Sequence, residues 1–250
     1  MRNLIKMDLY RLLHTISTWV MILLVIAAAF FCVALTTDIS DRYSNVVSIL
    51  EMLFHGGLFM VLCSVFVTIY ANAEQRNGYD KNLGGMIAHR GQLVVSKIIA
   101  VAIEVLSAFI LFAVAVTIAA KIFCGNQFMI GSFFDLFTLL GIQYLLHVGF
   151  ACFIVLICVL TRSSAFTMVS GILISGNIMN ILYSLANKLI HSISNNIDFD
   201  ISHFMVDYNI STYNLELSAS DMSRVIAVGC IFIIISVTCG FMVVEKRDVL

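Results

Sequence analysis

The sequence predicts an all-α integral membrane protein: one transmembrane domain of six membrane-spanning helices, with both termini in the cytoplasm. Of its 250 residues, 61% are apolar and 12% are charged, and the mean hydropathy is +1.02. Soluble domains carry about 25% charged residues. Six runs reach the length of about 20 residues that a helix needs to cross the hydrocarbon core. They are apolar on all sides, which excludes barrel strands, whose apolar residues alternate.

The six predicted spans follow one another along residues 1–250. The first is followed by "ALTTDISDRY", which lacks an A-x-A-like cleavage site, so we interpret it as a span and not as a signal peptide. Proline is absent from the sequence, so a break within a span would fall at glycine, serine or asparagine. The approximate limits of the spans are 18–35, 53–71, 98–120, 133–160, 166–186 and 225–244.

Lysine and arginine are concentrated in the segments that lie inside if both termini are cytoplasmic. Cytoplasmic loops carry an excess of these residues. On this topology the outside holds only four of the fourteen, Arg42, Lys121, Lys188 and Arg224. The outer loops instead carry carboxylates, which would concentrate cationic solutes near them. These are Asp38, Asp41, Glu51, Asp135, Asp198, Asp200, Asp207, Glu216 and Asp221.

Residues 1–17, "MRNLIKMDLYRLLHTIS", predict an interfacial helix along the inner leaflet. Apolar residues recur every three or four positions, whereas basic residues on the other side can reach water or lipid headgroups. Those basic residues are Arg2, Lys6, Arg11 and His14. The alternative is a basic flank that only fixes the topology.

Residues 72–97 form the predicted cytoplasmic loop between the second and third spans. Its stretch "NGYDKNLGGMIAHRGQ" holds several glycines around a short apolar piece, "LGGMIAH", which is too short to span a membrane. We expect a short helix here that docks on another protein. A solvated loop is the alternative.

Together these features resemble the membrane subunits of ABC-2-type ATP-binding cassette exporters. The likeness extends over the whole chain: a basic amphipathic start "KMDLYRLLH", two spans, the loop "EQRNGYDKNL…AHRGQLVVSK", and a long outer segment between spans five and six. Within the family, the chain is most similar to small permeases of Gram-positive bacteria that export, or give immunity to, antimicrobial and amphipathic peptides, including the phenol-soluble modulin and lantibiotic transporters. The positions that carry the likeness are Glu74, Arg76, Asn77, Gly78, Lys81, Asn82, Arg90 and Lys97.

The resemblance implies a division of labour between subunits. Residues 1–17 would be an elbow helix, and the loop at 72–97 would carry a coupling helix that docks on an ABC ATPase subunit. The chain has no G-x-x-x-x-G-K-[ST] phosphate loop, so ATP and Mg²⁺ are expected on that partner and no cofactor on this chain. The residues expected at the ATPase interface are Glu74, Arg76, Gly78, Lys81, Gly85, Met86, His89 and Arg90.

The same resemblance implies the other partners. They are two copies of the ATPase, a second permease subunit that is most simply a homodimer partner, and an amphipathic peptide as substrate. The expected location is the bacterial plasma membrane, and no nucleic acid is expected to bind. ATP hydrolysis would drive export by alternating access.

Polar residues within the apolar runs are candidates for the translocation path or the dimer interface. Span four places Gln143 and His147 on one face, and span five places Asn177, Asn180 and Ser184 along one side. A histidine in this position could relay protons. Hydrogen bonds between packed helices are the structural alternative for both sets.

Glu104 is the only acidic residue well inside an apolar run. It follows Lys97 by about two turns, which places it toward the cytoplasmic leaflet. A carboxylate within the membrane is a functional-site hypothesis by default, with Lys97 or a basic residue of the elbow helix as the expected partner. A salt bridge that fixes span three to the elbow helix is the structural alternative.

The outer segment at 187–224 is predicted to be either a small external cap or gate, or a solvated loop.

Other function classes find little support. An intramembrane hydrolase is the alternative function, because "HSISN" and "FDISH" resemble pieces of the CAAX-type membrane protease pattern. The adjoining Glu-Glu-x-x-x-Arg element and a zinc motif His-Glu-x-x-His are absent, so no catalytic or metal-binding residue is expected. A membrane sensor that works without an ATPase would need a ligand domain, and none is visible.

Overall fold

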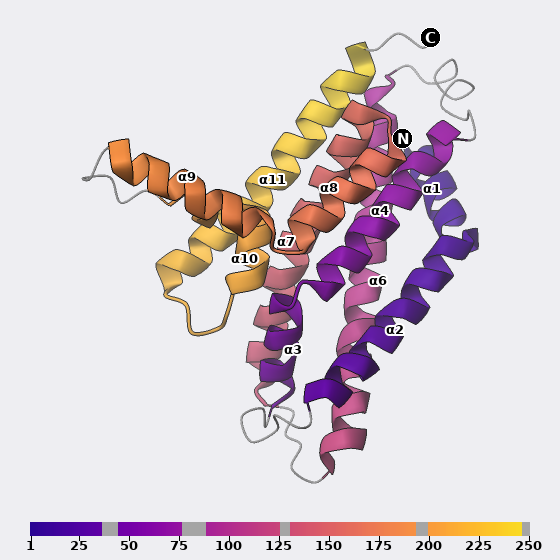
Figure 1. The fold of residues 1–250 in the computed structure, drawn as a ribbon. Helices are drawn as coiled ribbons and strands as arrows, with labels where there is room; N and C mark the ends of the chain where they lie inside the picture. The colour runs from indigo at the N-terminus through magenta and orange to yellow at the C-terminus, as the bar shows by residue number, and fades with distance from the viewer. Residues whose placement is uncertain (37–44, 77–88, 126–130, 194–199, 247–250) are drawn as a thin grey trace.

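The structure is a computed structural model that describes residues 1–36, 45–76, 89–125, 131–193 and 200–246. Every regular element in these ranges is a helix (Figure 1). The elements are α1 (Arg2–His14), α2 (Ile16–Thr36), α3 (Val46–His55), α4 (Leu58–Arg76), α6 (Gly91–Cys124), α7 (Phe133–Thr161), α8 (Ser164–Ser175), α9 (Met179–Ile193), the 3₁₀ turn η3 (Ile201–Phe204), α10 (Val206–Thr212) and α11 (Ala219–Lys246).

Four of these helices are long and apolar enough to cross a membrane by themselves. They are α2, α6, α7 and α11, and each contains a window of high hydropathy with few charges. Two further pairs, α3 with α4 and α8 with α9, qualify only if each bent pair counts as one span. The described residues therefore form an all-helical structure with four to six candidate spans, as in a multi-pass membrane protein.

The second and fifth predicted spans are not single straight helices. Between α3 and α4 the axis bends by 58°, and between α8 and α9 it bends by 68°. Gly57, with φ of 69°, lies at the first bend and Asn177, with φ of 60°, at the second. Both values belong to the left-handed region, which glycine and asparagine tolerate best. The breaks therefore fall at the residue types expected in a chain without proline.

The two bends lie against each other in the fold. A Cβ added at Gly57 would come 2.6 Å from the backbone oxygen of Ser175, the last residue of α8. Along α8, a Cβ at Gly171 would come 2.9 Å from the Cβ of Ser64 on α4. Glycine at these two positions thus allows α8 to pack closely on α4, as small residues do between membrane helices.

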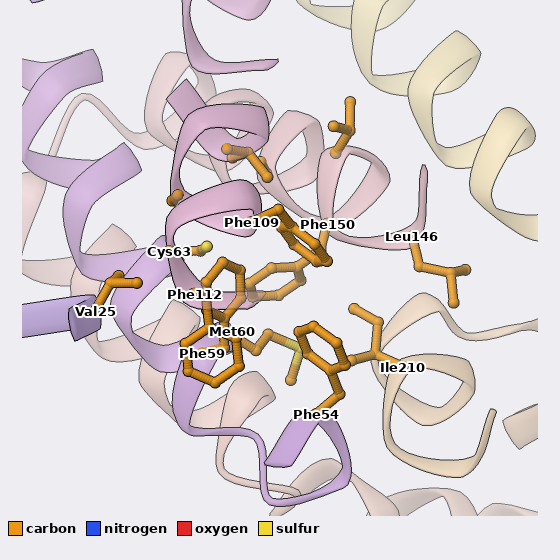
Figure 2. Packing of buried hydrophobic residues seen from close by; sticks show 14 of the residues in the cluster. Val25, Phe54, Phe59, Met60, Cys63, Phe109, Phe112, Leu146, Phe150 and Ile210 are labelled. Atoms are coloured by element: carbon orange, nitrogen blue, oxygen red, sulfur yellow. The ribbon is translucent and has the colours of Figure 1, made fainter. Parts of the chain in front are cut away.

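The most tightly packed region surrounds α7, which contacts α4, α6, α8, α10 and α11. Beside it, Phe54, Phe59, Phe109 and Phe112 are almost fully buried and form one aromatic cluster with centroid distances of 4.7–5.8 Å (Figure 2). These rings come from α3, α4 and α6, so the cluster joins both sides of the first bend to α6. The outward faces of α2 and α11 expose many large apolar side chains, as lipid-facing helices do.

α1 and the last turn of α11 lie at the same end of the helix bundle (Figure 1). α1 packs along α6 there, and the last turn of α11 reaches the first turn of α6. By contrast, α9 extends away from the bundle and packs mainly on η3. The short α10 is buried against α7 and α3.

Candidate functional site: the coupling end and the polar core

α1 is held against α4 and α6 by a buried carboxylate. Asp8 is 1% exposed, and its side chain accepts a hydrogen bond from the hydroxyl of Ser96 on α6. Its backbone oxygen accepts a hydrogen bond of 3.1 Å from the hydroxyl of Tyr70 on α4. Arg11 completes the group, with its Nη2 3.4 Å from Asp8 Oδ1 and its guanidinium 4.8 Å from the centre of the Tyr70 ring. Three helices that are distant in sequence therefore meet at one charged cluster.

The local sequence of α1 accounts for this arrangement. Asp8 and Leu12 are four residues apart and form the buried side of the helix, while Arg2 and Lys6 are exposed. The predicted helix over residues 1–17 is present from Arg2 to His14. The prediction did not single out Asp8 as a buried contact, because an acidic residue on an amphipathic helix is ordinarily solvated.

A second contact fastens the last turn of α11 to the first turn of α6. Glu245 Oε2 accepts a hydrogen bond of 2.9 Å from the amide of Gly91, and Oε1 lies 3.1 Å from Nδ1 of His89. The first amides of a helix have no partner within it, so a carboxylate placed there acts as a cap and interacts favourably with the helix dipole. A Cβ at Gly91 would overlap the ring of Phe241, so α6 and α11 approach closely only because residue 91 is glycine.

This contact places two of the predicted ATPase-interface residues. His89 is exposed and paired with Glu245, and Arg90 is the residue before the first turn of α6. Glu74 and Arg76 belong to the last turn of α4, but their side chains are outside the described part of the structure. Gly78, Lys81, Gly85 and Met86, and with them most of the predicted coupling helix, lie outside the described residues.

Gln143 and His147 lie within the core of the bundle. Both are 0% exposed. Gln143 donates a hydrogen bond of 3.1 Å from Nε2 to the backbone oxygen of Ile210 on α10, and Nδ1 of His147 lies 2.8 Å from the backbone oxygen of Gln143. The imidazole is surrounded by the rings of Phe54, Phe59 and Phe109, at centroid distances of 5.0–5.7 Å. Gln143 thus links α7 to the outer segment, and the role of both residues in transport stays a prediction.

The residues of the predicted polar face of span five do not share one continuous helix, because a bend separates α8 from α9, and their role in the translocation path or dimer interface stays a prediction. Asn177 lies in the bend, outside both helices. Asn180 is half-buried and Ser184 is exposed on α9, where the Ser184 hydroxyl bonds to the backbone oxygen of Ile181. A left-handed residue between two short helices breaks the 3.6-residue period on which the prediction rested.

Glu104 is buried in α6, as the sequence indicates, but the expected ion pair is not formed. It is 2% exposed, and its Oε2 lies 3.5 Å from the hydroxyl of Ser107 one turn later. Among the described residues, no ion pair joins Glu104 to Lys97 or to α1. Within α1, Asp8 and Arg11 form an ion pair.

Two polar contacts organise the outer segment after α9. The Tyr183 hydroxyl donates to both carboxylate oxygens of Asp207 on α10, at 3.1 and 3.0 Å. Asn187 Nδ2 donates to Asp200 Oδ1 at 2.5 Å, and Asp200 also accepts from the amide and hydroxyl of Ser202. This part of the predicted cap-or-loop segment is therefore folded and tied to α9.

The two carboxylates of this segment differ in their titration. Burial tends to raise the pKa of Asp200, but the hydrogen bonds from Ser202 and Asn187 outweigh it and the pKa is lowered. For Asp207, burial dominates over the hydrogen bond from Tyr183, and the pKa is raised.

α3 is tied to the chain just after α10. His55 Nε2 lies 2.7 Å from the backbone oxygen of Tyr213, and Glu51 Oε1 accepts a hydrogen bond of 3.0 Å from the amide of Leu215. Together with the bond from Gln143, these contacts seat α10 in a recess between α3 and α7. Within the described ranges, no group of three His, Cys, Asp or Glu side chains could hold a metal ion.

Comparison with known protein families decides the class of this molecule. The model of the family described as ABC-2 family transporter protein matches residues 4–187, which is more than half of the chain and runs from α1 to α9. The chain belongs to the ABC-2 transporter family. Permeases of this family are typically non-catalytic transport subunits that generally work with an ABC ATPase. No curated protein matches the chain.

Sequence reasoning did not single out four residues at the end of the bundle where α1, the start of α6 and the last turn of α11 meet, which is called the coupling end below after the role proposed for it. They are Asp8, Tyr70, Ser96 and Glu245. An acidic residue within the apolar periodicity of an amphipathic helix was a weak signal for Asp8. Glu245 gave no signal, since its contact with Gly91 joins positions 154 residues apart.

Proposed function

We propose that this chain is the permease subunit of an ATP-driven exporter and that it couples to a separate ABC ATPase through the segment between α4 and α6. The family match supports a transport subunit. The observation that carries the coupling proposal is the fastening of Gly91 and His89 to Glu245. A partner that moves the segment before Gly91 would move α6 and α11 together, because their ends are joined there.

The basic residues support the assignment of this end as the cytoplasmic one. Arg2, Lys6 and Arg11 lie on α1, Arg90 precedes α6, and Lys246 ends α11. An excess of such residues marks the cytoplasmic side of a membrane protein. We propose the bacterial plasma membrane as the location. In this orientation α1 is the elbow helix on the cytoplasmic side, and α10 lies toward the outside.

The coupling would run through α6 as a lever. α1 is joined to α4 and α6 by Asp8, and α11 is joined to α6 by Glu245. ATP binding would draw two ATPase subunits together and displace the segments docked on them, rocking the helix bundles of two permease copies about their interface. The coupling would be reciprocal, so substrate would also change ATP affinity.

We propose an amphipathic or antimicrobial peptide as the exported substrate. The support is chemical: the outer segments carry carboxylates such as Asp135, Glu216 and Asp221, which favour release of a cationic solute on that side. The bends at Gly57 and Asn177 interrupt two spans side by side, as discontinuous helices do near the substrate sites of other transporters.

Reconstituted ATPase activity tests the function. The permease and its ATPase in lipid vesicles are expected to hydrolyse ATP faster when a cationic amphipathic peptide is added, and the ATPase alone is not. The same peptide with its charges reversed is the control. An ATPase that ignores the permease in every lipid and peptide mixture would contradict the exporter assignment.

A further inference from the structure

A pocket opens at the coupling end of the bundle, between the junction of α1 with α2 and the neighbouring parts of α4 and α8. Its volume is about 650 Å³, within the range of about 300 to 1,000 Å³ typical of small-molecule sites. It does not include Gln143 or His147, and it is separate from the Glu245 contact. Its lining residues are Arg11, His14, Thr15, Ile16, Ser17, Thr68, Ile69, Tyr70, Asn72, Ala73, Ser164 and Met168.

The polar part of the lining is suited to an anion. It contains a guanidinium, an imidazole, an amide and five hydroxyl groups, and no carboxylate is among the described residues that line it. Two of the hydroxyls, Oγ of Ser17 and Oγ1 of Thr68, are buried and have no hydrogen-bond partner in the part of the chain that the structure describes. Thr68 is 0% exposed, and a buried hydroxyl without a partner is unfavourable unless a ligand or water satisfies it.

The apolar part of the lining continues onto the lipid-facing surface. Ile16 is 79% exposed and Ile69 is 44% exposed, and Met168 lies near them on α8. The neighbouring Trp19 is 62% exposed and donates its indole N–H to the backbone oxygen of Leu13. Tryptophan favours the boundary between headgroups and hydrocarbon, so the mouth of the pocket lies near headgroup depth.

We propose that this pocket binds one phosphate-headed anionic amphiphile of the inner leaflet, its phosphate near Arg11 and the hydroxyls of Ser17 and Thr68 and its acyl chain along Ile16 and Ile69. Arginine recognises phosphate by charge and by hydrogen bonds, and the acyl chain extends the contact out of the pocket. The ligand would hold α1 and α2 against α4 and α8. This proposal does not depend on the exporter function.

The test is a count of bound lipid by native mass spectrometry on the purified full chain. Dioleoyl phosphatidylglycerol is expected to stay bound as one copy per chain, and dioleoyl phosphatidylcholine to bind about tenfold more weakly, because the second lipid carries no net negative charge. An excess of sodium phosphate is expected to leave the phosphatidylglycerol in place. Displacement of the phosphatidylglycerol by phosphate alone would overturn the proposal of an amphiphile and would point to a soluble phosphate ligand.

Variants locate the site without disturbing the buried ion pair. The double variant Ser17→Ala with Thr68→Val removes both unsatisfied hydroxyls at nearly constant shape and is expected to weaken phosphatidylglycerol binding by roughly threefold to tenfold. Ser164→Trp would fill the mouth and abolish binding. The matched control, Lys6→Gln, removes an exposed charge of α1 outside the pocket and is expected to leave the count unchanged. Equal retention of both lipids, or retention unaffected by both pocket variants, would overturn the proposal.

Discussion

The coupling end of the bundle and the outer segment after α9 are both held by polar contacts between distant parts of the chain, but they are built differently. At the coupling end, Asp8 and Glu245 fasten long helices directly to one another. In the outer segment, Tyr183 and Asn187 fasten the projecting α9 to short elements, η3 and α10. The first arrangement joins long helices to one another, and the second holds a short segment against α9.

One carboxylate of each region illustrates a difference in burial. Asp8 is almost fully buried beside a guanidinium, whereas Asp200 is 41% exposed in its side chain. Removing one partner of a buried ion pair strongly destabilises a fold, because the other charge is left buried, whereas an exposed ion pair contributes little to the stability of the fold. Loss of a contact at the coupling end should therefore affect the whole bundle, and loss in the outer segment should affect α9 and α10 locally.

The largest effect is expected from Asp8→Leu. The change removes the carboxylate beside Arg11 and one of the two acceptors of the Ser96 hydroxyl, and we expect a loss of about 2 to 4 kcal/mol, less than for a fully buried pair because Arg11 is partly exposed. Thermal unfolding in detergent measures it. Asp135→Leu, which removes an exposed carboxylate of α7, is the control and should change little. Equal effects of the two variants would show that the buried cluster does not hold α1.

An intermediate effect is expected from Tyr183→Phe. The variant removes the hydroxyl that donates to Asp207 and leaves a mostly buried carboxylate with one hydrogen bond fewer, which costs about 1 to 2 kcal/mol. Hydrogen exchange should speed up in α9 and α10 and stay unchanged in α1 and α6. The control is Ser184→Ala at the next position, whose hydroxyl bonds only within α9. Faster exchange throughout the bundle would remove the distinction between the two regions.

Glu245→Ala should affect stability less but coupling more. The side chain is exposed, so its loss as a helix cap is expected to change the stability of the fold only a little. The stimulation of ATPase activity by the permease should nevertheless fall, because α11 no longer follows the segment before Gly91. Lys246→Ala is the matched control, and it should preserve stimulation. Normal stimulation in the Glu245 variant would argue against this contact as part of the coupling.

The smallest effect concerns pH and separates Asp200 from Asp207 within the outer segment. A carboxylate with a lowered pKa stabilises the fold above its unfolded pKa of about 3.9, and this contribution is lost as pH falls through the folded pKa. Asp207 behaves in the opposite way because its pKa is raised. As pH rises above the unfolded pKa of about 3.9, its carboxyl ionises more readily in the unfolded chain than in the folded one, which lowers the stability of the fold. Exchange in η3 should therefore increase on acidification to pH 4 and below. This increase should disappear in Asp200→Asn and persist in Asp207→Asn.

The sequence predicts the long helices because their physical cause is local. Runs of apolar side chains over 20 residues are stable in lipid only as helices, whose backbone groups are satisfied internally. The lengths of α2, α6, α7 and α11 follow from this. The bends at Gly57 and Asn177 could not be placed, because hydropathy averages over a window and does not register one residue with positive φ.

The contacts at the candidate site depend on the tertiary structure and escape a reading of one sequence. Asp8 meets Ser96 across 88 positions, and Glu245 meets Gly91 across 154. The sequence did indicate that Glu104, Gln143 and His147 lie within apolar runs, and all three are buried. It could not identify their contacts, which are the Ser107 hydroxyl for Glu104, the backbone of Ile210 for Gln143 and the backbone of Gln143 for His147.

Whether the segment between α4 and α6 couples this chain to an ATPase is tested most directly by co-purification. The permease is expressed with the ABC ATPase, and the wild type is compared with a variant in which residues 85–90 are replaced by a polar linker. We expect the wild-type chains to elute together and the vesicle-bound complex to change its ATP turnover, and the variant to fold normally but lose both properties. Continued co-elution with unchanged turnover in the variant would contradict the coupling role of this segment.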